Sequence, residues 1–265
     1  MKNKVFESHN FNWIKDLTSK LNAQGFEFDF IDDKELTLIG IKNSKLIINF
    51  VEIGTAQTPE NLIELQTKFY SNNLNLIHLW EDVFTTKPVE VIERIKSLTG
   101  KNTRIHGRKT NVLKITKPEA DAFLNENHLQ GSVSSRYKFG LFTNNELVAV
   151  ATFSALRKMN HTQNYKSIEL IRFAVKAGFS VNGGLSKLIM HVGKNLQPND
   201  VMSYADRDWS FGSSYQKLGF EQVSFSKPQT FLLDENLTRT LVKDENPKTH
   251  PTVFNTGSIK FILKF

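Results

Sequence analysis

The stretch "SVNGGLSKLI" (residues 180–189) decides the fold class of the second half of this chain. A strand-like run, "SIELIRFAV" (167–175), precedes it, and "GGLSKLIMHVGKNL" (183–196) has the periodicity of an amphipathic helix. A helix that begins after glycines presents unpaired N–H groups and the positive end of its dipole, so it can bind phosphates. A plain turn has the same glycine pattern, and both interpretations stay open on this motif alone.

The elements around this stretch predict an α/β domain. A helix is expected at 116–128, with Thr116 as N-cap and Glu119 at N3, followed by two strands around an Asn144–Asn145 turn within 137–156. The strand at 167–175 and the helix at 183–196 come next. A strand at "VMSYAD" (201–206), a helix at "SSYQKLGF" (213–220) and β-like segments complete the order.

This order resembles the GNAT acyltransferase fold. The resemblance implies acyl-CoA as donor, with its diphosphate at the start of the helix. The cofactor-binding residues are then Asn182, Gly183, Gly184, Ser186 and Lys187. In the family, an Arg or Gln usually opens this loop. In this chain the corresponding position lies near Val181, so the sequence departs from the family pattern there.

Two phage-associated groups are more similar still. One is the Mom family of DNA adenine-modification proteins, which are GNAT relatives. The other is the long phage homing endonucleases, which join a very-short-patch-repair-like nuclease domain to a second domain of this kind. The motifs that carry the resemblance are "NENHLQG" (125–131), "ELIRFAV" (169–175), "VNGGLSKLI" (181–189) and "SYADRDWSFGSSYQ" (203–216).

The first hundred residues are expected to form a second α/β unit. Helices are expected at 11–22, 58–73 and 87–100, and strands at 26–30, 35–41, 45–53 and 74–83. This half resembles the PD-(D/E)XK nuclease fold, in which acids on neighbouring strands hold a divalent metal. The positions of the acids and of the basic residue fall on Leu38, Asn49 and Leu65, so we expect an inactive nuclease-like domain. Glu52 faces the other side of a regular strand, and only a bulge would bring it to the site.

Four residues are candidates for catalysis in the second domain: His128, Arg172, Asp206 and Tyr215. His128 is either a base or a structural hydrogen-bonding residue. Arg172 and Asp206 form either a structural ion pair or a phosphate contact beside a general base. The resemblance gives Tyr215 the role of the acid that protonates the leaving thiolate; its alternative is a helix residue that packs on Phe220.

A basic run, "KNTRIHGRKTNVLKITK" (101–117), separates the two halves and contains no acid. It is either a solvated linker with an edge strand or a strip that contacts phosphates. With the formal charge of +7, the second interpretation makes DNA the expected partner. The predicted nucleic-acid contacts are Arg104, Arg108, Lys109, Arg207 and Trp209, the last by stacking on a flipped base.

Composition narrows the classes of site. Hydrophobic residues make up 39% and charged residues 23% of the 265, as in globular proteins. The absence of cysteine excludes disulfides, thiolate metal sites and a cysteine nucleophile, and the histidine spacing predicts no metal. The start "MKNKVFESHNFNW" lacks a secretory signal, and no apolar run is long enough for a membrane span. We therefore expect a cytoplasmic protein, with association with a virion left open.

The sequence thus predicts a degenerate restriction-endonuclease-like domain (1–100) followed by a GNAT/Mom-like domain (101–265). The leading hypothesis is a phage or mobile-element protein whose second domain transfers an acyl-type group to a nucleobase. The alternatives are a non-catalytic DNA-binding relative of homing endonucleases and a metal-dependent endonuclease with relocated carboxylates.

Overall fold

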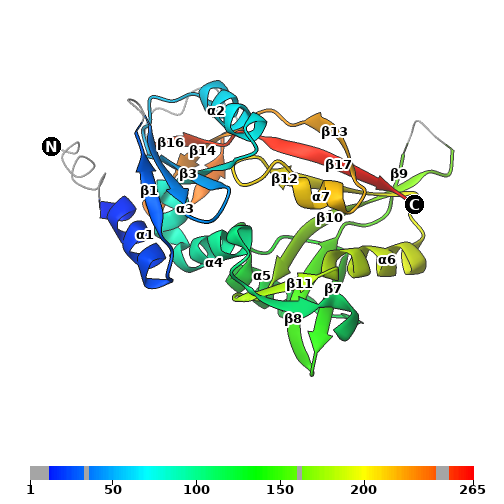
Figure 1. The fold of residues 1–265 in the computed structure, drawn as a ribbon. Helices are drawn as coiled ribbons and strands as arrows, with labels where there is room; N and C mark the ends of the chain where they lie inside the picture. Colours follow the sequence, from blue (N-terminus) through cyan, green and yellow to red (C-terminus); the bar gives the residue numbers. More distant parts are fainter. Residues whose placement is uncertain (1–11, 33–35, 160–162, 243–250) are drawn as a thin grey trace. The chain divides into compact units, whose positions relative to one another are not determined.

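β3 (Leu46–Val51) organises the first half of the chain, because all six of its residues are buried. It pairs with β2 (Thr37–Ile41) antiparallel and with β4 (Asn75–Trp80) parallel, and β1 (Phe28–Ile31) completes a sheet in the order β1-β2-β3-β4. α1 (Asn12–Ala23) and α2 (Pro59–Ser71) belong to the same half (Figure 1). α1 packs through Trp13, whose ring contacts Phe50 and Phe84.

The computed structural model describes residues 12–32, 36–159, 163–242 and 251–265. Several predicted features lie outside these ranges. They are Phe11, at the start of the helix expected over 11–22, Glu35, at the start of the strand expected over 35–41, and three of the histidines whose spacing was considered, His9, His161 and His250.

The chain forms two compact units that alternate along the sequence. Unit 1 comprises Met1–Ile92, Asp206–Phe211 and Ser226–Ser258, and unit 2 comprises Glu93–Ala205, Gly212–Phe225 and Ile259–Phe265. The domain boundary at residue 100 stays a prediction, and it does not account for the two later segments that join unit 1.

The last part of unit 1 adds a second, small sheet. Its order is β15-β14-β16, from β14 (Thr230–Leu233), β15 (Arg239–Leu241) and β16 (Thr252–Phe254). Leu233 and Val253 share a buried apolar cluster with Val51, Leu62 and Trp80. α3 (Glu81–Thr86) follows β4 directly, so the strand predicted over 74–83 is wrong beyond Trp80.

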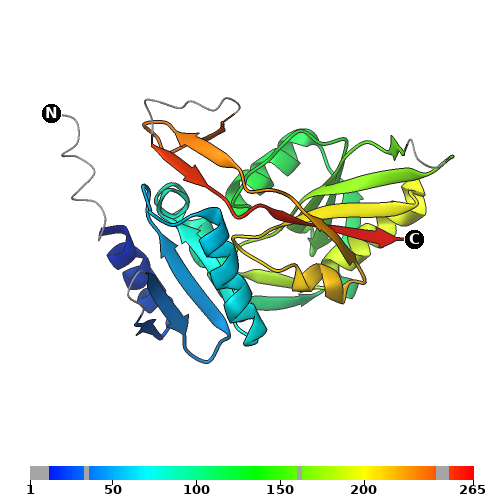
Figure 2. The ribbon, with the colours of Figure 1, turned by 90° about the horizontal axis from the view of Figure 1, so that it is seen from above.

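Unit 2 is built on an eight-stranded mixed sheet, and seven of its strands follow the order β13-β17-β12-β10-β8-β7-β6. β17, the last strand in the chain, is red in Figure 2. Its strands are β6 (Asn111–Lys114), β7 (Tyr137–Thr143), β8 (Glu146–Phe153), β9 (Arg157–Lys158), β10 (Lys166–Val175), β12 (Asp200–Asp206), β13 (Glu221–Phe225) and β17 (Ser258–Lys264). The short β9 pairs with β10. A separate parallel pair joins β5 (Thr103–His106) to β11 (Phe179–Asn182).

The helices of unit 2 are α5 (Lys117–Asn127), α6 (Gly184–Leu196) and α7 (Ser213–Lys217), with a 3₁₀ turn η1 (Gly107–Lys109); α4 (Pro88–Thr99) crosses from unit 1 into unit 2. Thr116 and Glu119 form the predicted capping box of α5. Asn144 and Asn145 both have positive φ, as a two-residue hairpin turn requires. Within the described residues, no helix is long and apolar enough to cross a membrane.

Candidate functional site

The central feature of unit 2 is a parallel strand pair that opens halfway. β10 and β12 pair from Ser167 with Asp200 to Leu170 with Ser203, although β10 continues to Val175 and β12 to Asp206. The register of β10 on β8 shifts between Leu170 and Arg172, which marks a bulge at the same point. The two strands therefore part after Leu170.

Arg172 is directed to backbone carbonyls at this opening. Its Nε donates to the Gly131 carbonyl oxygen at 3.2 Å, and its Nη1 donates to the Ile171 carbonyl oxygen at 3.0 Å. Gly131 closes the turn that contains His128, because its N–H donates to the His128 carbonyl at 2.8 Å. Arg172 thus fastens the bulge of β10 to the turn after α5. The predicted pair with Asp206 would join the two units and stays a prediction.

His128 ends α5 and shapes this turn. Its Nδ1 accepts a hydrogen bond from the Gln130 N–H at 3.1 Å, so the neutral ring carries its proton on Nε2. The neighbouring asparagines of "NENHLQG" are also used locally. Asn125 Oδ1 accepts from the Ser132 N–H, and Asn127 Oδ1 accepts from the Ala177 N–H just beyond β10. The motif therefore builds a turn and attaches it to the end of β10.

Tyr215 lies on α7, and its phenol reaches the point where the strands part. Its oxygen lies 2.9 Å from Ser203 Oγ, and Ser203 Oγ lies 3.0 Å from the Leu170 carbonyl oxygen. The ring packs edge-on against Phe220 and stacks on Phe261. Burial raises the pKa of Tyr215, so the phenol is protonated at neutral pH. Ser203 was not singled out from the sequence; the available signal was a polar residue on the buried side of a strand.

The start of α6 carries the predicted phosphate residues. Gly183 caps the helix with φ +74°, and no side chain caps the first turn. Asn182 is exposed and Ser186 half-buried. The Lys187 ammonium instead donates to the carbonyls of Gly107, at 3.0 Å, and Thr110.

The η1 turn lies directly against this helix start, which sequence analysis did not predict. A Cβ atom added to Gly107 would lie 2.8 Å from the Asn182 carbonyl oxygen and 3.1 Å from Gly184 N. Glycine is therefore required for the close approach, and it could have been suspected from the single glycine within the basic run. Lys187 holds η1 in place and does not extend toward solvent.

The predicted nucleic-acid residues fall into two groups. In the run 101–117 of unit 2, all six cations are exposed: Lys101, Arg104, Arg108, Lys109, Lys114 and Lys117. Arg207 and Trp209 lie instead in the Asp206–Phe211 segment of unit 1, where the Arg207 carbonyl accepts from Gln66 Nε2 at 2.6 Å. Trp209 is only 6% exposed, so its indole is buried and does not offer a face for stacking on a base.

The Asp206–Phe211 segment is fixed to unit 1 by buried polar contacts. Asp208 is buried, and its Oδ1 accepts from the Thr256 N–H at 2.9 Å and from the Thr256 hydroxyl at 2.6 Å. Asp206 Oδ1 accepts from the Asp208 N–H. Burial, together with the charge of Asp206, raises the pKa of Asp208 to about 7.

The positions expected to have lost nuclease ligands do lie together in unit 1. Leu38 is directly opposite Asn49 across β2 and β3, and both are almost fully buried. Leu38 belongs to an apolar cluster against which Leu65 packs. Hydrophobic side chains cannot replace carboxylate ligands, so this patch supplies no metal site, and the nuclease hypothesis receives no support from it.

Asn49 forms a hydrogen bond with the buried His78. Its Nδ2 lies 3.0 Å from His78 Nδ1, and His78 Nε2 lies 3.0 Å from the Leu62 carbonyl oxygen. Because a carbonyl only accepts, Nε2 carries the proton and Asn49 donates to Nδ1. Burial lowers the pKa of His78 to about 3, which keeps the ring neutral.

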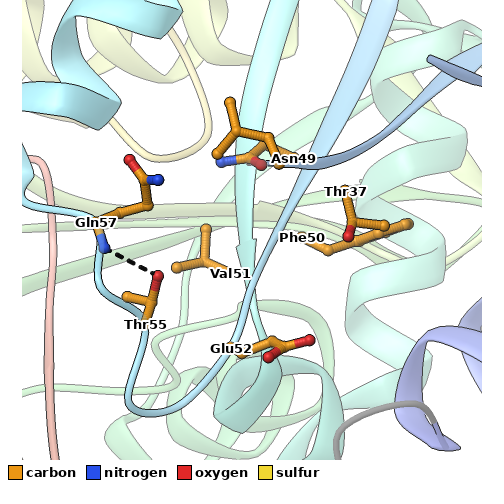
Figure 3. A pocket seen from close by; sticks show the side chains of 8 residues that line it. Thr37, Asn49, Phe50, Val51, Glu52, Thr55 and Gln57 are labelled. Carbon is orange, nitrogen blue, oxygen red and sulfur yellow. Dashed lines mark hydrogen bonds between the residues drawn. The ribbon is translucent and has the colours of Figure 1, made fainter. Parts of the chain in front are cut away.

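Glu52 borders a small pocket beside this hairpin, of about 140 Å³ (Figure 3). Thr37, Thr55 and Gln57 also line it, and the Gln57 N–H donates to Thr55 Oγ1 at 3.2 Å. Burial raises the pKa of Glu52. Within the described ranges, no three His, Asp or Glu side chains group in a way that could hold a metal ion.

No family model matches the chain, and no curated protein matches it in sequence. Among solved structures, it is similar to an acetyltransferase from Bacillus subtilis in complex with CoA, with 15% identity, a TM-score of 0.40, and coverage of 59% of this chain and 99% of the other. It is also similar to the ribosomal-protein-S18-alanine N-acetyltransferase from Escherichia coli, with 14% identity, a TM-score of 0.38, and coverage of 58% of this chain and 93% of the other. A third similar structure is a GNAT family acetyltransferase from Elizabethkingia anophelis with acetyl-CoA bound, with 15% identity, a TM-score of 0.36, and coverage of 59% of this chain and 99% of the other.

Proposed function

We propose that unit 2 is a GNAT-type acyltransferase that uses acyl-CoA and that its acceptor is a nucleobase in DNA. The observation that carries the proposal is the opening of β10 and β12 after Leu170 and Ser203. A strand edge that loses its partner can pair with an extended chain, and the pantetheine arm of CoA is such a chain. The thioester of acyl-CoA supplies the activated acyl group.

The residues around the opening fit a donor of this kind. The first turn of α6 has no side-chain cap, so its N–H groups and the helix dipole favour a diphosphate there. Gly183, Gly184 and Ser186 would hold it, while Lys187 stays with η1. Tyr215 is protonated and would serve as the acid for the leaving thiolate. Asp206 and His128 remain proposed base or acceptor contacts.

A single substitution separates binding at α6 from general loss of stability. Ser186 is the third residue of α6, where an acidic side chain stabilises the helix dipole. We expect Ser186→Asp to keep or raise the free energy of unfolding while it weakens acetyl-CoA binding at least tenfold through charge repulsion. Titration calorimetry measures the affinity, with Lys42→Ala on the exposed surface of unit 1 as the control. Equal affinities for wild type and Ser186→Asp would contradict a donor site at this helix.

The acceptor is tested by mass analysis of nucleosides from DNA co-expressed with the protein. An acylated nucleoside is expected with wild type and lost with Asp206→Asn. Unmodified DNA, together with bound acetyl-CoA, would contradict only the nucleobase as acceptor.

A second candidate function, non-catalytic binding of DNA, is favoured by the six exposed cations of residues 101–117. Neutralising Arg104, Arg108 and Lys109 together should weaken DNA binding and reduce the slope of log K against log salt by about 3, since each phosphate contact contributes about 0.9. This function predicts no modified nucleoside and no effect of Asp206→Asn. An unchanged salt slope in the triple variant would contradict a role for the strip.

A further inference from the structure

The Ser203 hydroxyl contacts the Tyr215 phenol at the end of the paired part of β10 and β12. Its Oγ lies 2.9 Å from the phenol oxygen and 3.0 Å from the Leu170 carbonyl oxygen, and Ser203 is 1% exposed. The hydroxyl thus stands between two oxygens at the point where the strands part.

The arrangement fixes the direction of both hydrogen bonds. A serine hydroxyl has one proton, and a carbonyl oxygen can only accept. Ser203 therefore donates to Leu170, and the phenol of Tyr215 donates to Ser203. If the phenol loses its proton, the same hydroxyl can rotate and donate to the phenolate instead.

We propose that Ser203 is a positioning residue for Tyr215 that turns its hydroxyl from the Leu170 carbonyl to the phenolate as Tyr215 protonates the leaving thiolate. The O–H bond of Tyr215 breaks and an S–H bond forms with the thiolate electron pair, while the O–H bond of Ser203 stays intact. This inference rests on the proposed acyl transfer and adds a partner that stabilises the ionised acid.

The surroundings of the phenol explain why such a partner matters. The rings of Phe220 and Phe261 flank Tyr215 and cannot stabilise a negative charge. Burial raises the pKa of Tyr215, whereas Ser203 and the charge of Arg94 on α4 lower it. Ser203 touches the phenol oxygen directly, so its removal takes away a hydrogen-bond donor to the phenolate and leaves the charge of Arg94 to favour the ionised form.

Ser203→Ala removes the hydroxyl and retains the strand. In steady-state acyl transfer we expect kcat to fall about tenfold, which is less than the ~10²–10⁴-fold lost when a general acid is removed entirely, with KM for acyl-CoA changed less than about twofold. The alkaline pKa of the kcat profile should rise. The absorbance of tyrosinate, measured as the difference from Tyr215→Phe in the same background, should show the same upward shift of the Tyr215 pKa. The titration is read only below the pH at which circular dichroism reports unfolding.

The matched control is Ser167→Ala on the neighbouring strand. Ser167 is also buried, and its hydroxyl bonds Asp200 and not Tyr215. A purely structural loss would affect both variants alike and leave the two pH profiles unmoved; that result overturns the inference. A wild type that binds no acyl-CoA and turns none over sinks the proposed function itself, and the tyrosinate titration then decides alone whether Ser203 controls the phenol.

Discussion

Arg172 Nε donates to the Gly131 carbonyl oxygen across 41 positions of sequence, at 3.2 Å. With its second bond to the Ile171 carbonyl, the guanidinium links the bulge of β10 to the turn that follows α5. Both of these bonds go to main-chain oxygens, which supports a structural role for Arg172 in holding the turn.

Arg172→Ala should therefore lower the free energy of unfolding by about 2 kcal/mol, since it removes two hydrogen bonds from a charged donor. Urea denaturation measures the loss. The control is Arg157→Ala, because Arg157 is exposed and pairs with Glu169 on the surface, where such pairs contribute about 0–1 kcal/mol. Unchanged stability in Arg172→Ala, combined with weaker binding of acyl-CoA or DNA, would instead support the ligand contact.

Gly107→Ala tests the packing of η1 on α6. Its Cβ would lie 2.8 Å from a backbone oxygen, which cannot move without shifting the helix start. We expect a loss of about 1–3 kcal/mol in the free energy of unfolding, as for other overpacked sites. Gly40→Ala is the control, because its Cβ would meet only the ends of two flexible side chains, those of Ile47 at 3.3 Å and Ile31 at 3.6 Å. Equal stability of the two variants would mean that η1 is not closely packed.

Features set by local chemistry could be predicted from the sequence. The capping box of Thr116 and Glu119 and the turn at Asn144–Asn145 are confirmed. Each depends on a side chain that satisfies nearby backbone groups or on a residue that tolerates positive φ. Such signals need only a few consecutive residues.

Features that depend on distant backbone contacts could not be predicted. β5 and β11 are four residues each and pair across about 75 positions through main-chain bonds, which leave no periodicity to detect. The site shows the same limit. Packing of Tyr215 on Phe220 was one of the two interpretations of this residue, and the contact is observed. The contact of Ser203 with the Tyr215 phenol depends on how β12 and α7 pack together, which the sequence does not reveal.

The pair of Arg239 and Asp82 joins the small sheet of unit 1 to α3. Arg239 Nε and Nη2 donate to the two carboxylate oxygens at 2.6 and 2.8 Å, and the guanidinium lies 5.5 Å from the Trp80 ring centroid. Arg239→Ala should lower the free energy of unfolding by about 3–5 kcal/mol, because it leaves the buried Asp82 carboxylate without its partner. Arg239→Lys should restore only part of the lost free energy of unfolding, since an ammonium cannot form the two parallel hydrogen bonds.

Chemical denaturation of both variants measures this difference. Lys42→Ala, which breaks an exposed pair with Asp29, serves as the control and should change stability by less than about 1 kcal/mol. A comparably small effect of Arg239→Ala would indicate that residues 226–258 fold without this contact.

Asp208 predicts a fall in stability between acid and neutral pH. Its pKa is raised from 3.8 to about 7, so the folded protein binds a proton there that the unfolded chain has released. The free energy of unfolding should therefore decrease as pH rises from about 4 to 7 and not change further from this group above pH 7. The causes are burial first and then the charge of Asp206, opposed by Thr256 and Arg239.

Asp208→Asn isolates this contribution. The amide oxygen can still accept both bonds from Thr256, and no charge is buried at any pH. We expect the variant to lose the decline between pH 4 and 7 and to be more stable than wild type at pH 7.5, as measured by denaturation at both ends of this range. Asp121→Asn on the surface of α5 controls for the loss of one carboxylate. A parallel pH dependence in wild type and Asp208→Asn would show that Asp208 is ionised throughout, with Arg239 as the partner that keeps it so.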